Sequence, residues 1–568
     1  MKLVRLKMLA SFRSLSEGFE MNFRSQHVLH RDSDDLSDFN PFCLVGLNGS
    51  GKSNVLEALS GIFFHLDSCT SKYKPTAFTK HFDPKTSTPT GFEVEYFIGL
   101  NNGSPYVIQN FYKVRILKEP SLEPKMYVQS YPFSSNQEEV AVSLNSQFGE
   151  AAPARIYLPD LVVGYSSGEN EILSHAFIKT RFIHFDEYIE AVAKNYFYSE
   201  PESSLVYIDE GMSQAVLLSN MLFQDDDTLK PLRENLGVCA MRSFRININM
   251  HEIKVRGEKE NYIKQNIIKQ LDGSIDSLKA CSTCWYEYID ESGLKHLVLD
   301  YWVNEATKLA FKEHFQNAFT LFRLFQVLYT LNNRIVTDDI KEEVYQSKGF
   351  YIDGKIPHAA PSDHVFYFLD FLITKENKNS NSKIDLLLRN FSDGEHQFLH
   401  TIGICLMLKN HRTLLLLDEP ETHFNPNWRS KFIKTLRDSI KAGGGNNLLK
   451  EVLMTSHSPF IISDSKSKFV HIFKKNNNDI TTTQTAENIN LNTFGTSVNL
   501  ITMKVFGKTE TIADLSNDKI SEIKHSFEQG DITADEALQI ANQLGESLEK
   551  TLLIVAINNK PKNDVVLL

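Results

Sequence analysis

The sequence lacks three features that would each define a class of protein. It has 60 basic against 71 acidic residues, so it carries no overall positive charge for nucleic acid, and any such contact would have to be local. No apolar run approaches the roughly 18 to 20 residues of a membrane span, and the first residues lack the apolar segment of a secretory signal. Six cysteines in 568 residues are too few for a disulfide scaffold. These absences predict a cytoplasmic protein with no membrane partner.

The cysteines include one C-x-x-C pair, Cys281 and Cys284. A zinc site needs four ligands, so this pair would need further ligands from elsewhere. The segment that follows, WYEYIDESGLKHLVLDYWV, predicts a hairpin that turns at Glu-Ser-Gly. We therefore expect two ordinary thiols here, and a metal site is the alternative.

The length and composition indicate a large soluble α/β protein. A chain of 568 residues is too long for one compact core, and two to four domains are expected. Alternating or short apolar runs predict strands, and apolar residues at helical spacing predict a helix over 427–441. The region 175–375 mixes helical patterns with a few strands, one of them at 181–187, and 375–383 reads as a polar linker. The other expected strands cover 2–9, 19–24, 41–46, 91–100, 106–116, 413–420 and 451–459.

The segment GLNGSGKS (46–53) fits the pattern G-x-x-x-x-G-K-[ST] between a predicted strand and a predicted helix. Glycines let backbone amides surround anionic oxygens, and the helix N-terminus adds its positive dipole end. Lys52 is expected to reach the β- and γ-phosphates of a nucleotide, and Ser53 to bind Mg²⁺. The predicted ATP-binding residues of this loop are Gly46, Asn48, Gly49, Ser50, Gly51, Lys52 and Ser53.

A second segment, TLLLLDEP (413–420), predicts a buried strand with two carboxylates at its end. Asp418 suits the Mg²⁺ shell, and Glu419 suits a general base that polarises the attacking water. A strand that ends in an acidic helix cap would look the same in isolation. The phosphate-binding loop elsewhere in the chain favours the catalytic interpretation.

Four segments in order, GLNGSGKSNVLEAL, FSDGEHQFL, LLLLDEPETHFNP and TSHSP, resemble the ABC-type ATPases of the SMC, RecF and OLD kind. The resemblance covers about the first 120 residues and about 386–465. It implies that Asn54 belongs to the nucleotide-binding loop and that His457 is a catalytic switch residue at the γ-phosphate. It also matches a D-loop to Glu421, His423 and Asn425.

The resemblance also identifies a signature turn. In such ATPases a Ser-x-Gly-Glu turn precedes the acidic strand by about two dozen residues and faces the nucleotide of a second protomer. Ser392, Gly394 and Glu395 fit this spacing, and Asp393 departs from the commoner small residue. The implied assembly is a homodimer or higher oligomer that closes on ATP and Mg²⁺.

The fold class implied is α/β. It is a P-loop ABC-type ATPase head, with a mixed sheet and an antiparallel lobe, interrupted by a long, mainly helical insertion and followed by a helical extension. The expected divisions are 1–165 for the first part of the head with its antiparallel lobe, 166–385 for the insertion, 386–475 for the second part of the head, and 476–568 for the extension.

A second Ser-x-Gly-Glu turn occurs in YSSGENEILS (165–174). Its position after an apolar strand resembles the Q-loop, although the Q-loop glutamine is absent. Ser166 or Ser167 would then contact Mg²⁺ or its waters, and the alternative is a plain strand-to-helix cap. The predicted strands 181–187 and 205–210 each end in an acidic pair, which would fit a decayed second ATPase unit, but no second phosphate-binding motif exists in the chain.

Three functions remain open for the expected ATPase. The chain resembles the ATPases of bacterial anti-phage and restriction-associated modules, such as the Septu ATPase subunit, which imply a separately encoded HNH-type nuclease as partner. A RecF- or SMC-like DNA-repair ATPase would use a basic surface, for which only scattered residues qualify. An OLD-type nuclease would need an Asp-x-Asp pair after 465, which is absent. The candidate basic residues are Arg242, Arg245, Lys254, Arg256 and Lys259.

The end of the chain contains one clear helix start. Thr533 with Glu536 forms a predicted capping box before a helix over 534–544. We expect the segment beyond about 510 to dock a partner or a second protomer. The alternative is that this helix packs on the ATPase core of its own chain.

Overall fold

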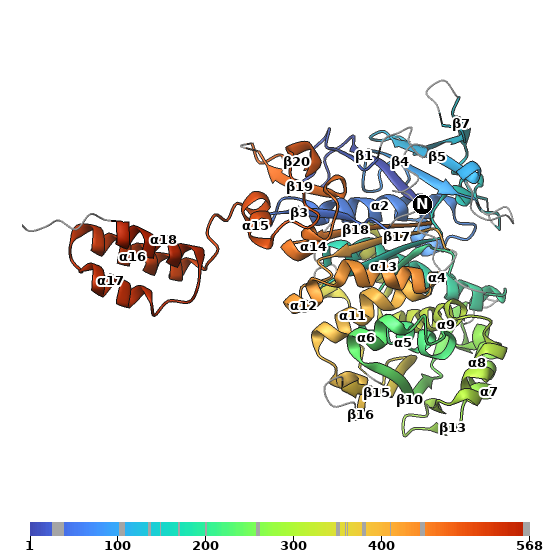
Figure 1. Ribbon diagram of the computed structural model, residues 1–568. Helices are drawn as coiled ribbons and strands as arrows, with labels where there is room; N and C mark the ends of the chain where they lie inside the picture. The colour runs from blue at the N-terminus through green and yellow to red at the C-terminus, as the bar shows by residue number, and fades with distance from the viewer. Residues whose placement is uncertain are drawn as a thin grey trace, which may run out of the picture. The chain divides into compact units, whose positions relative to one another are not determined.

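The computed structural model divides the chain into two units, Met1–Asn492 and Thr493–Leu568. Each unit is described by itself (Figure 1). The described residues are 1–24, 39–100, 108–133, 138–147, 149–167, 171–198, 201–256, 262–347, 353–357, 359–360, 362–377, 382–408, 411–443, 449–476 and 478–559.

A seven-stranded mixed sheet forms the centre of the first unit, in the order β20-β19-β3-β18-β17-β8-β9. All neighbours are parallel except the β19–β20 pair. Parallel strands present their carboxyl ends at one edge of a sheet, where ligands bind in open α/β folds. The strands are β3 (Phe42–Gly46), β8 (Leu161–Ser166), β9 (Leu205–Tyr207), β17 (Thr413–Asp418), β18 (Lys450–Ser456), β19 (Val470–Lys475) and β20 (Thr481–Thr485).

A six-stranded antiparallel sheet lies on the other side of helix α2 (Lys52–Thr70), in the order β2-β1-β4-β5-β6-β7 (Figure 1). One apolar core joins α2 to both sheets, so nearly every side chain of this helix is buried. The expected antiparallel lobe is therefore present. Its strands are β1 (Lys2–Met8), β2 (Glu20–Asn22), β4 (Phe92–Gly99), β5 (Phe111–Lys118), β6 (Lys125–Ser130) and β7 (Val140–Val142).

The middle of the chain contains many helices, as expected, together with an antiparallel sheet that was not expected. Its antiparallel sheet has the order β13-β14-β10-β15-β16, and β11 pairs with β12. The strands are β10 (Val238–Asn249), β11 (Glu252–Arg256), β12 (Tyr262–Asn266), β13 (Cys284–Ile289), β14 (Lys295–Trp302), β15 (Phe366–Asn377) and β16 (Ser382–Leu387). The helices are α4 (Glu171–Lys194), α5 (Glu210–Phe223), α6 (Lys230–Leu236), α7 (Asp272–Cys281), α8 (Glu305–His314), α9 (Ala318–Thr330) and α10 (Asp338–Gln346).

Three local predictions are wrong. The segment 181–187, expected to be a strand, lies inside α4, where its apolar residues are buried. The segment 375–383, expected to be a polar linker, includes strand residues. The last residues of β15 are 375–377, and the first residues of β16, which pairs with β15, include 382–383. The helix expected over 427–441 is split into α12 (Pro426–Arg429) and α13 (Phe432–Ala442). Three consecutive glycines at 443–445 predict a turn after this helix, but Gly444 and Gly445 lie outside the described residues.

The hairpin expected after Cys284 is confirmed by the antiparallel pairing of β13 with β14. Cys281 is buried at the end of α7, whereas Cys284 is exposed and its Sγ lies 3.9 Å from Oδ2 of Asp300. Within the described ranges, no group of three or more His, Cys, Asp or Glu side chains is placed to hold a metal ion. The helices of those ranges also include none with the length and apolar content to cross a membrane.

The second unit consists of helices with a core of their own. Helices α16 (Asp514–Gln529), α17 (Ala534–Ala541) and α18 (Leu548–Asn559) share one apolar cluster, and α15 (Val498–Phe506) precedes them. The capping box of Thr533 and Glu536 is confirmed at the start of α17. The extension expected from residue 476 instead begins at 493, because β20 still belongs to the central sheet.

Candidate nucleotide-binding site

The loop after β3 has the backbone conformation of a phosphate-binding loop. Gly46 and Gly51 have φ values of 148° and 97°, which glycine adopts without strain. A Cβ on Gly46 would lie 2.4 Å from the carbonyl oxygen of Phe473, and one on Gly51 would lie 2.6 Å from Oγ of Ser14. Neither position therefore admits a side chain. The loop ends at the N-terminus of α2, whose dipole favours an anion.

Two buried side chains of this loop point to a bound anion. Nζ of Lys52 donates to the carbonyl oxygens of Gly46 and Leu47, at 3.2 and 3.0 Å. Burial lowers the pKa of Lys52, and the carboxylates of Glu419 and Asp418 oppose this shift. The hydroxyl of Ser50 is buried without a hydrogen-bond partner among the described residues. An anion in the loop would give the hydroxyl of Ser50 a hydrogen-bond partner and would place an opposite charge beside Lys52.

Asp418 is brought to the loop by the parallel order of the strands. Its Oδ1 accepts a hydrogen bond of 2.8 Å from Oγ of Ser53 and one of 2.6 Å from Oγ1 of Thr455. Burial raises its pKa, and the hydrogen bonds from Thr455 and Ser53 oppose the rise. A hydroxyl beside a carboxylate is an oxygen donor set of the kind Mg²⁺ takes beside a nucleotide, so these residues fit the expected metal.

Glu419, the next residue, has a left-handed backbone with φ of 47°. Its amide donates to Oγ1 of Thr455 at 2.9 Å, which holds this conformation. Its Oε1 lies 3.3 Å from Nε2 of His457. This contact lowers the pKa of Glu419, so the carboxylate is held in the charged form that a base requires.

The strand end before the second Ser-x-Gly-Glu turn also reaches this site. β8 pairs in parallel register with β17, which places Ser166 opposite Asp418, and Oγ of Ser166 lies 3.5 Å from its Oδ2. The amide of Ser167 donates to the carbonyl oxygen of Asp418, and its hydroxyl contacts Thr422. Gly168 and Glu169 of this turn lie outside the described residues.

Asn54 is held from outside the loop. Its Oδ1 accepts a 2.7 Å hydrogen bond from Oγ of Ser14, and its Nδ2 donates to Oε2 of Glu57. Arg13, with φ of 54°, forms an ion pair with Glu57 at 2.9 Å. The segment between β1 and β2 therefore positions the first turn of α2.

The expected signature turn begins helix α11 (Asp393–Gly403). Ser392 and Glu395 form a capping box, and Lys375 forms an ion pair with Glu395. Ser392 is exposed, and its amide and hydroxyl both donate to Oε2 of Glu395 in the same helix. A Cβ on Gly394 would lie 2.9 Å from the carbonyl oxygen of His423, so the helix start packs closely on the expected D-loop.

The expected D-loop residues have separate local roles. Glu421 is buried, its Oε1 accepts a hydrogen bond from Ser456 at 2.5 Å, and burial raises its pKa to about 7. The amide of His423 donates to Oε1 of Gln397 in α11. Asn425 caps α12 through the amide of Trp428.

The sequence analysis missed two residues of this site. Thr455 links Asp418 to the backbone of Glu419, and its position two residues before His457 in the TSHSP segment was the available signal. The hydroxyl of Ser14 donates to Asn54 and lies 2.6 Å from the position that a Cβ on Gly51 would take. Its role depends on a loop far away in the sequence, and no local pattern indicated it.

Comparison with known proteins adds a partial family match. Residues 313–463 match the family described as "AAA domain, putative AbiEii toxin, Type IV TA system". No curated protein matches the chain. A solved structure that matches is described as the crystal structure of the SmcHead bound to the C-winged helix domain of ScpA. It has 9% identity and a TM-score of 0.33, and the match covers 85% of this chain and 98% of that chain.

The fold and the site together define a class. The mixed sheet, the glycine loop before α2 and the carboxylates at the end of β17 are those of a P-loop ATPase. The matched family is a domain of the same class, and it covers the second half of the site but not the loop at 46–53.

Proposed function

We propose that this chain binds and hydrolyses ATP and acts as a switch that closes as a dimer. The observation that carries this proposal is the 2.8 Å contact between Ser53 and Asp418, which joins the phosphate-binding loop to the acidic strand end. Such a pair is useful for phosphoryl chemistry and has no evident purpose in a purely structural turn.

Each residue has a role that follows from its position. Lys52 and the amides of the loop bind the β- and γ-phosphates, and Gly46, Asn48, Gly49, Ser50, Gly51 and Asn54 shape that loop. Ser53 and Asp418 would hold Mg²⁺, which neutralises charge on the phosphates when it is bound. Glu419 accepts the proton of the attacking water, and His457 orients its carboxylate.

The proposed dimer uses the exposed signature turn. Ser392 and Gly394 would meet the γ-phosphate held by a second chain, and Glu395 would keep the turn in shape through its bonds to Ser392. This arrangement is supported by the exposure of Ser392 beside an intact helix N-terminus.

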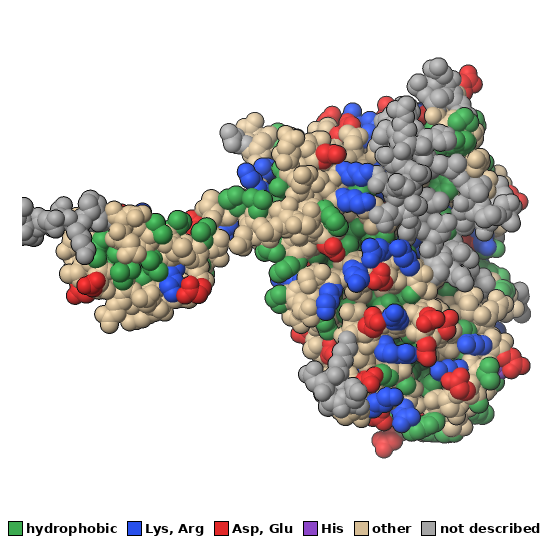
Figure 2. Space-filling model, in the orientation of Figure 1, with side chains coloured by type: hydrophobic (Ala, Val, Ile, Leu, Met, Phe, Trp, Pro, Cys, Tyr) green, Lys and Arg blue, Asp and Glu red, His purple; other side chains and the backbone are tan. Residues whose placement is uncertain are grey.

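The proposed output is control of a separately encoded HNH-type nuclease in anti-phage defence. The description of the matched family, which names a putative toxin, supports a role in such a module. The surface gives less support to a DNA-repair ATPase. Arg242 and Arg245 pair with Asp385 and Asp300, at 3.6 and 2.7 Å, and acidic and basic side chains are interspersed on the face in Figure 2.

The test combines three measurements on the purified chain. We expect Mg²⁺-dependent ATP turnover that Lys52→Ala abolishes, a mass shift from monomer to dimer with ATP in light scattering, and co-purification with a nuclease encoded beside it. Failure of turnover would refute the ATPase. Turnover stimulated by DNA without a nuclease partner would instead favour the repair ATPase, and DNA cleavage by the chain alone would favour an OLD-type enzyme.

A further inference from the structure

A cavity of about 1060 Å³ lies beside the proposed ATP site, within the first unit. It is bounded by the ends of β8 and β9, by α4, α5 and α9, by β15, and by the start of α11. Its volume is at the upper end of the range for small-molecule pockets. Ser166, which contacts Asp418, and Gln397, which binds the D-loop, both line it.

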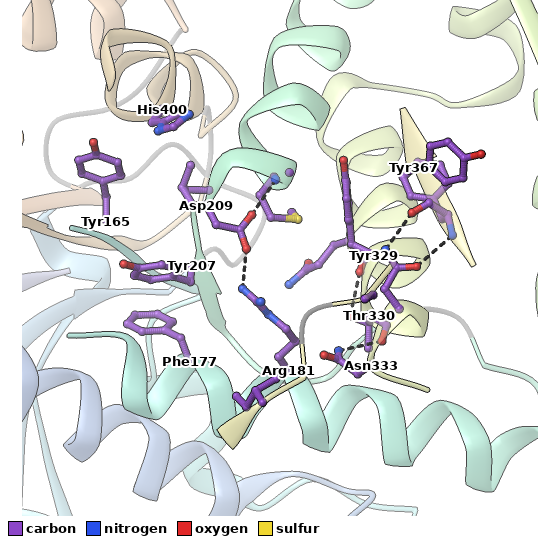
Figure 3. A pocket seen from close by; sticks show the side chains of 18 of the residues that line it. Tyr165, Phe177, Arg181, Tyr207, Asp209, Tyr329, Thr330, Asn333, Tyr367 and His400 are labelled. Carbon is purple, nitrogen blue, oxygen red and sulfur yellow. Dashed lines mark hydrogen bonds and ion pairs between the residues drawn. The ribbon is translucent and has the colours of Figure 1, made fainter. Parts of the chain in front are cut away.

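Aromatic rings form two walls of this cavity. Figure 3 shows Tyr165, Tyr207 and Phe177 along one side and Tyr329 with Tyr367 across from them. The rings are supported in place: the centroids of Phe177 and Tyr207 are 5.5 Å apart, and Tyr329 packs edge-on against Phe366 at 5.0 Å. Each of these aromatic walls offers ring faces on which a flat ring system can stack.

Polar groups that line the cavity are only partly used in hydrogen bonds within the protein. Nε2 of His184 and Nε2 of His400 are buried without a hydrogen-bond partner among the described residues. Asn333 donates from Nδ2 to the carbonyl oxygen of Thr330, which leaves its Oδ1 as an acceptor, and Oε1 of Gln326 already accepts from Arg323. Donors and acceptors of this kind match the edge of a nitrogen heterocycle.

The charges of the cavity argue against a polyphosphate as its ligand. Arg181 is paired with Asp209 at 2.7 Å in the middle of the cavity. Arg389 and Asp393 are exposed where α11 begins, and the lining within the described ranges includes no lysine. Burial lowers the pKa of His184 to about 3 and that of His400 to about 4, so both rings are neutral at pH 7. The interior therefore suits an uncharged ligand.

We propose that this cavity binds a nucleobase, stacked on one of its tyrosine walls and read by polar groups that line the cavity, Asn333 among them. The base could belong to a free nucleoside or to an unpaired nucleotide of a strand, since both present the same ring. Occupancy would act on ATP turnover through the end of β8 and through α11. This coupling rests on the proposed ATPase function, whereas the binding does not.

The test uses calorimetry on the full chain carrying Lys52→Ala, so that the P-loop site does not contribute. The probes are adenosine, guanosine, cytidine and uridine, and a mixed-sequence single-stranded DNA of ten nucleotides. We expect at least one probe to bind with one ligand per chain. Binding of a nucleoside assigns the free ligand, and binding of the oligonucleotide alone assigns the strand. The proposal is overturned if none of the probes binds.

Two variants of different kinds locate the binding. Asn333→Trp fills the cavity and Tyr367→Ala removes a wall, and each should weaken binding by about tenfold or more. Tyr286→Ala, at an exposed ring on β13, is the matched control and should leave affinity unchanged. Affinity that survives both cavity variants, each checked for a normal thermal transition, places the ligand elsewhere and overturns the proposal.

The coupling has its own readout. Saturating ligand should change the ATP turnover of the otherwise unmodified chain at least about twofold, and Asn333→Trp should remove that response. Binding of the ligand without a change in ATP turnover would overturn the proposed coupling, but the proposed binding site would stand. A chain without any ATP turnover would refute the ATPase proposal, while the calorimetric result would still decide whether the cavity binds a nucleobase.

Discussion

His457 Nε2 lies 3.3 Å from Oε1 of Glu419, across the ends of two neighbouring strands. The two side chains are both partly exposed, so the pair stands at the surface of the site rather than in the core. A carboxylate that is charged, oriented and open to water is suited to accept a proton from that water. This relationship is the basis of the first prediction.

Glu419→Gln should leave ATP binding intact and lower turnover about 10²- to 10⁴-fold, since only the base is removed. The measurements are nucleotide affinity by calorimetry and phosphate release at saturating ATP. His457→Asn should lower turnover less, because the carboxylate remains. Normal turnover by the Gln variant would remove Glu419 from the role of base.

Thr455→Val should impair the site without touching a proposed phosphate or metal ligand. The hydroxyl donates to Asp418 and accepts from the amide of Glu419, so its loss frees both residues. We expect the apparent Mg²⁺ affinity in turnover assays to fall about 10- to 100-fold. Thr455→Ser keeps the hydroxyl and should retain most activity. Equal effects of Val and Ser would show that the methyl group, and not the hydroxyl, matters.

The sequence predicted those parts of the site that depend on short patterns. The loop at 46–53 and the strand end at Asp418 and Glu419 are each coded by a few adjacent residues, and the parallel sheet brings the two together. The role of Ser14 could not be predicted, because it depends on contact between segments distant in sequence. Thr455 was indicated only by its place in the TSHSP segment, and its contacts with Asp418 and Glu419 depend on the pairing of distant strands.

The errors in the fold have a similar cause. The segment at 181–187 has a few apolar residues followed by an acidic pair, which indicated a strand end. Residues of α4 are buried around much of its circumference, so its helical period is not visible in the sequence. The polar composition of 375–383 indicated a linker, but 375–377 and 382–384 pair with one another as the ends of β15 and β16. The antiparallel sheet of the middle region depends on pairings such as β10 with β15 that no local pattern specifies.

The buried carboxyl of Glu421 predicts a pH dependence of stability. Its pKa is raised from 4.5 to about 7 by burial, against the opposing hydrogen bond from Ser456. The folded state therefore holds this proton more tightly than the unfolded state, and stability falls as pH rises from 4.5 through 7. The loss amounts to roughly 3 kcal/mol at most.

Glu421→Gln should flatten this dependence, because an amide does not titrate. The measurement is the midpoint of thermal unfolding between pH 5 and pH 8.5 for both chains. The slope is compared rather than the absolute midpoint, since the buried amide has its own hydrogen-bonding cost. Identical slopes would mean that Glu421 does not titrate in this range.

Deletion of 510–568 should leave ATP turnover unchanged and abolish partner binding. The buried residues of α16, α17 and α18 pack on one another in an apolar cluster of their own. Deleting these helices therefore removes no residue of the first unit from its core. Exposed Leu548, Leu552 and Val555 on α18 would provide the docking surface. Size-exclusion chromatography with the nuclease or with a second protomer measures the binding. Loss of turnover through unfolding would favour packing on the ATPase core.

The two Ser-x-Gly-Glu turns make opposite predictions in mixed dimers. Ser392 donates to Glu395 of its own helix, whereas Ser166 lies beside Asp418 of the same chain. A Ser392→Arg chain should be inactive alone, because the side chain fills the slot for the facing phosphate. Its ATP affinity should change far less, since the contact forms only on closure.

Mixing Ser392→Arg with Lys52→Ala should restore activity. In a heterodimer the Ser392→Arg chain supplies an intact Lys52 and its partner supplies an intact Ser392, so one of the two sites is complete. Random pairing of equal amounts should give about a quarter of the wild-type rate per chain. Ser166→Arg mixed with Lys52→Ala should stay inactive. Ser166 and Lys52 both act on the nucleotide of their own chain, so each of the two sites in the heterodimer carries one of the defects. Complementation by the Ser166 variant and not by the Ser392 variant would show that the roles of the two turns are reversed.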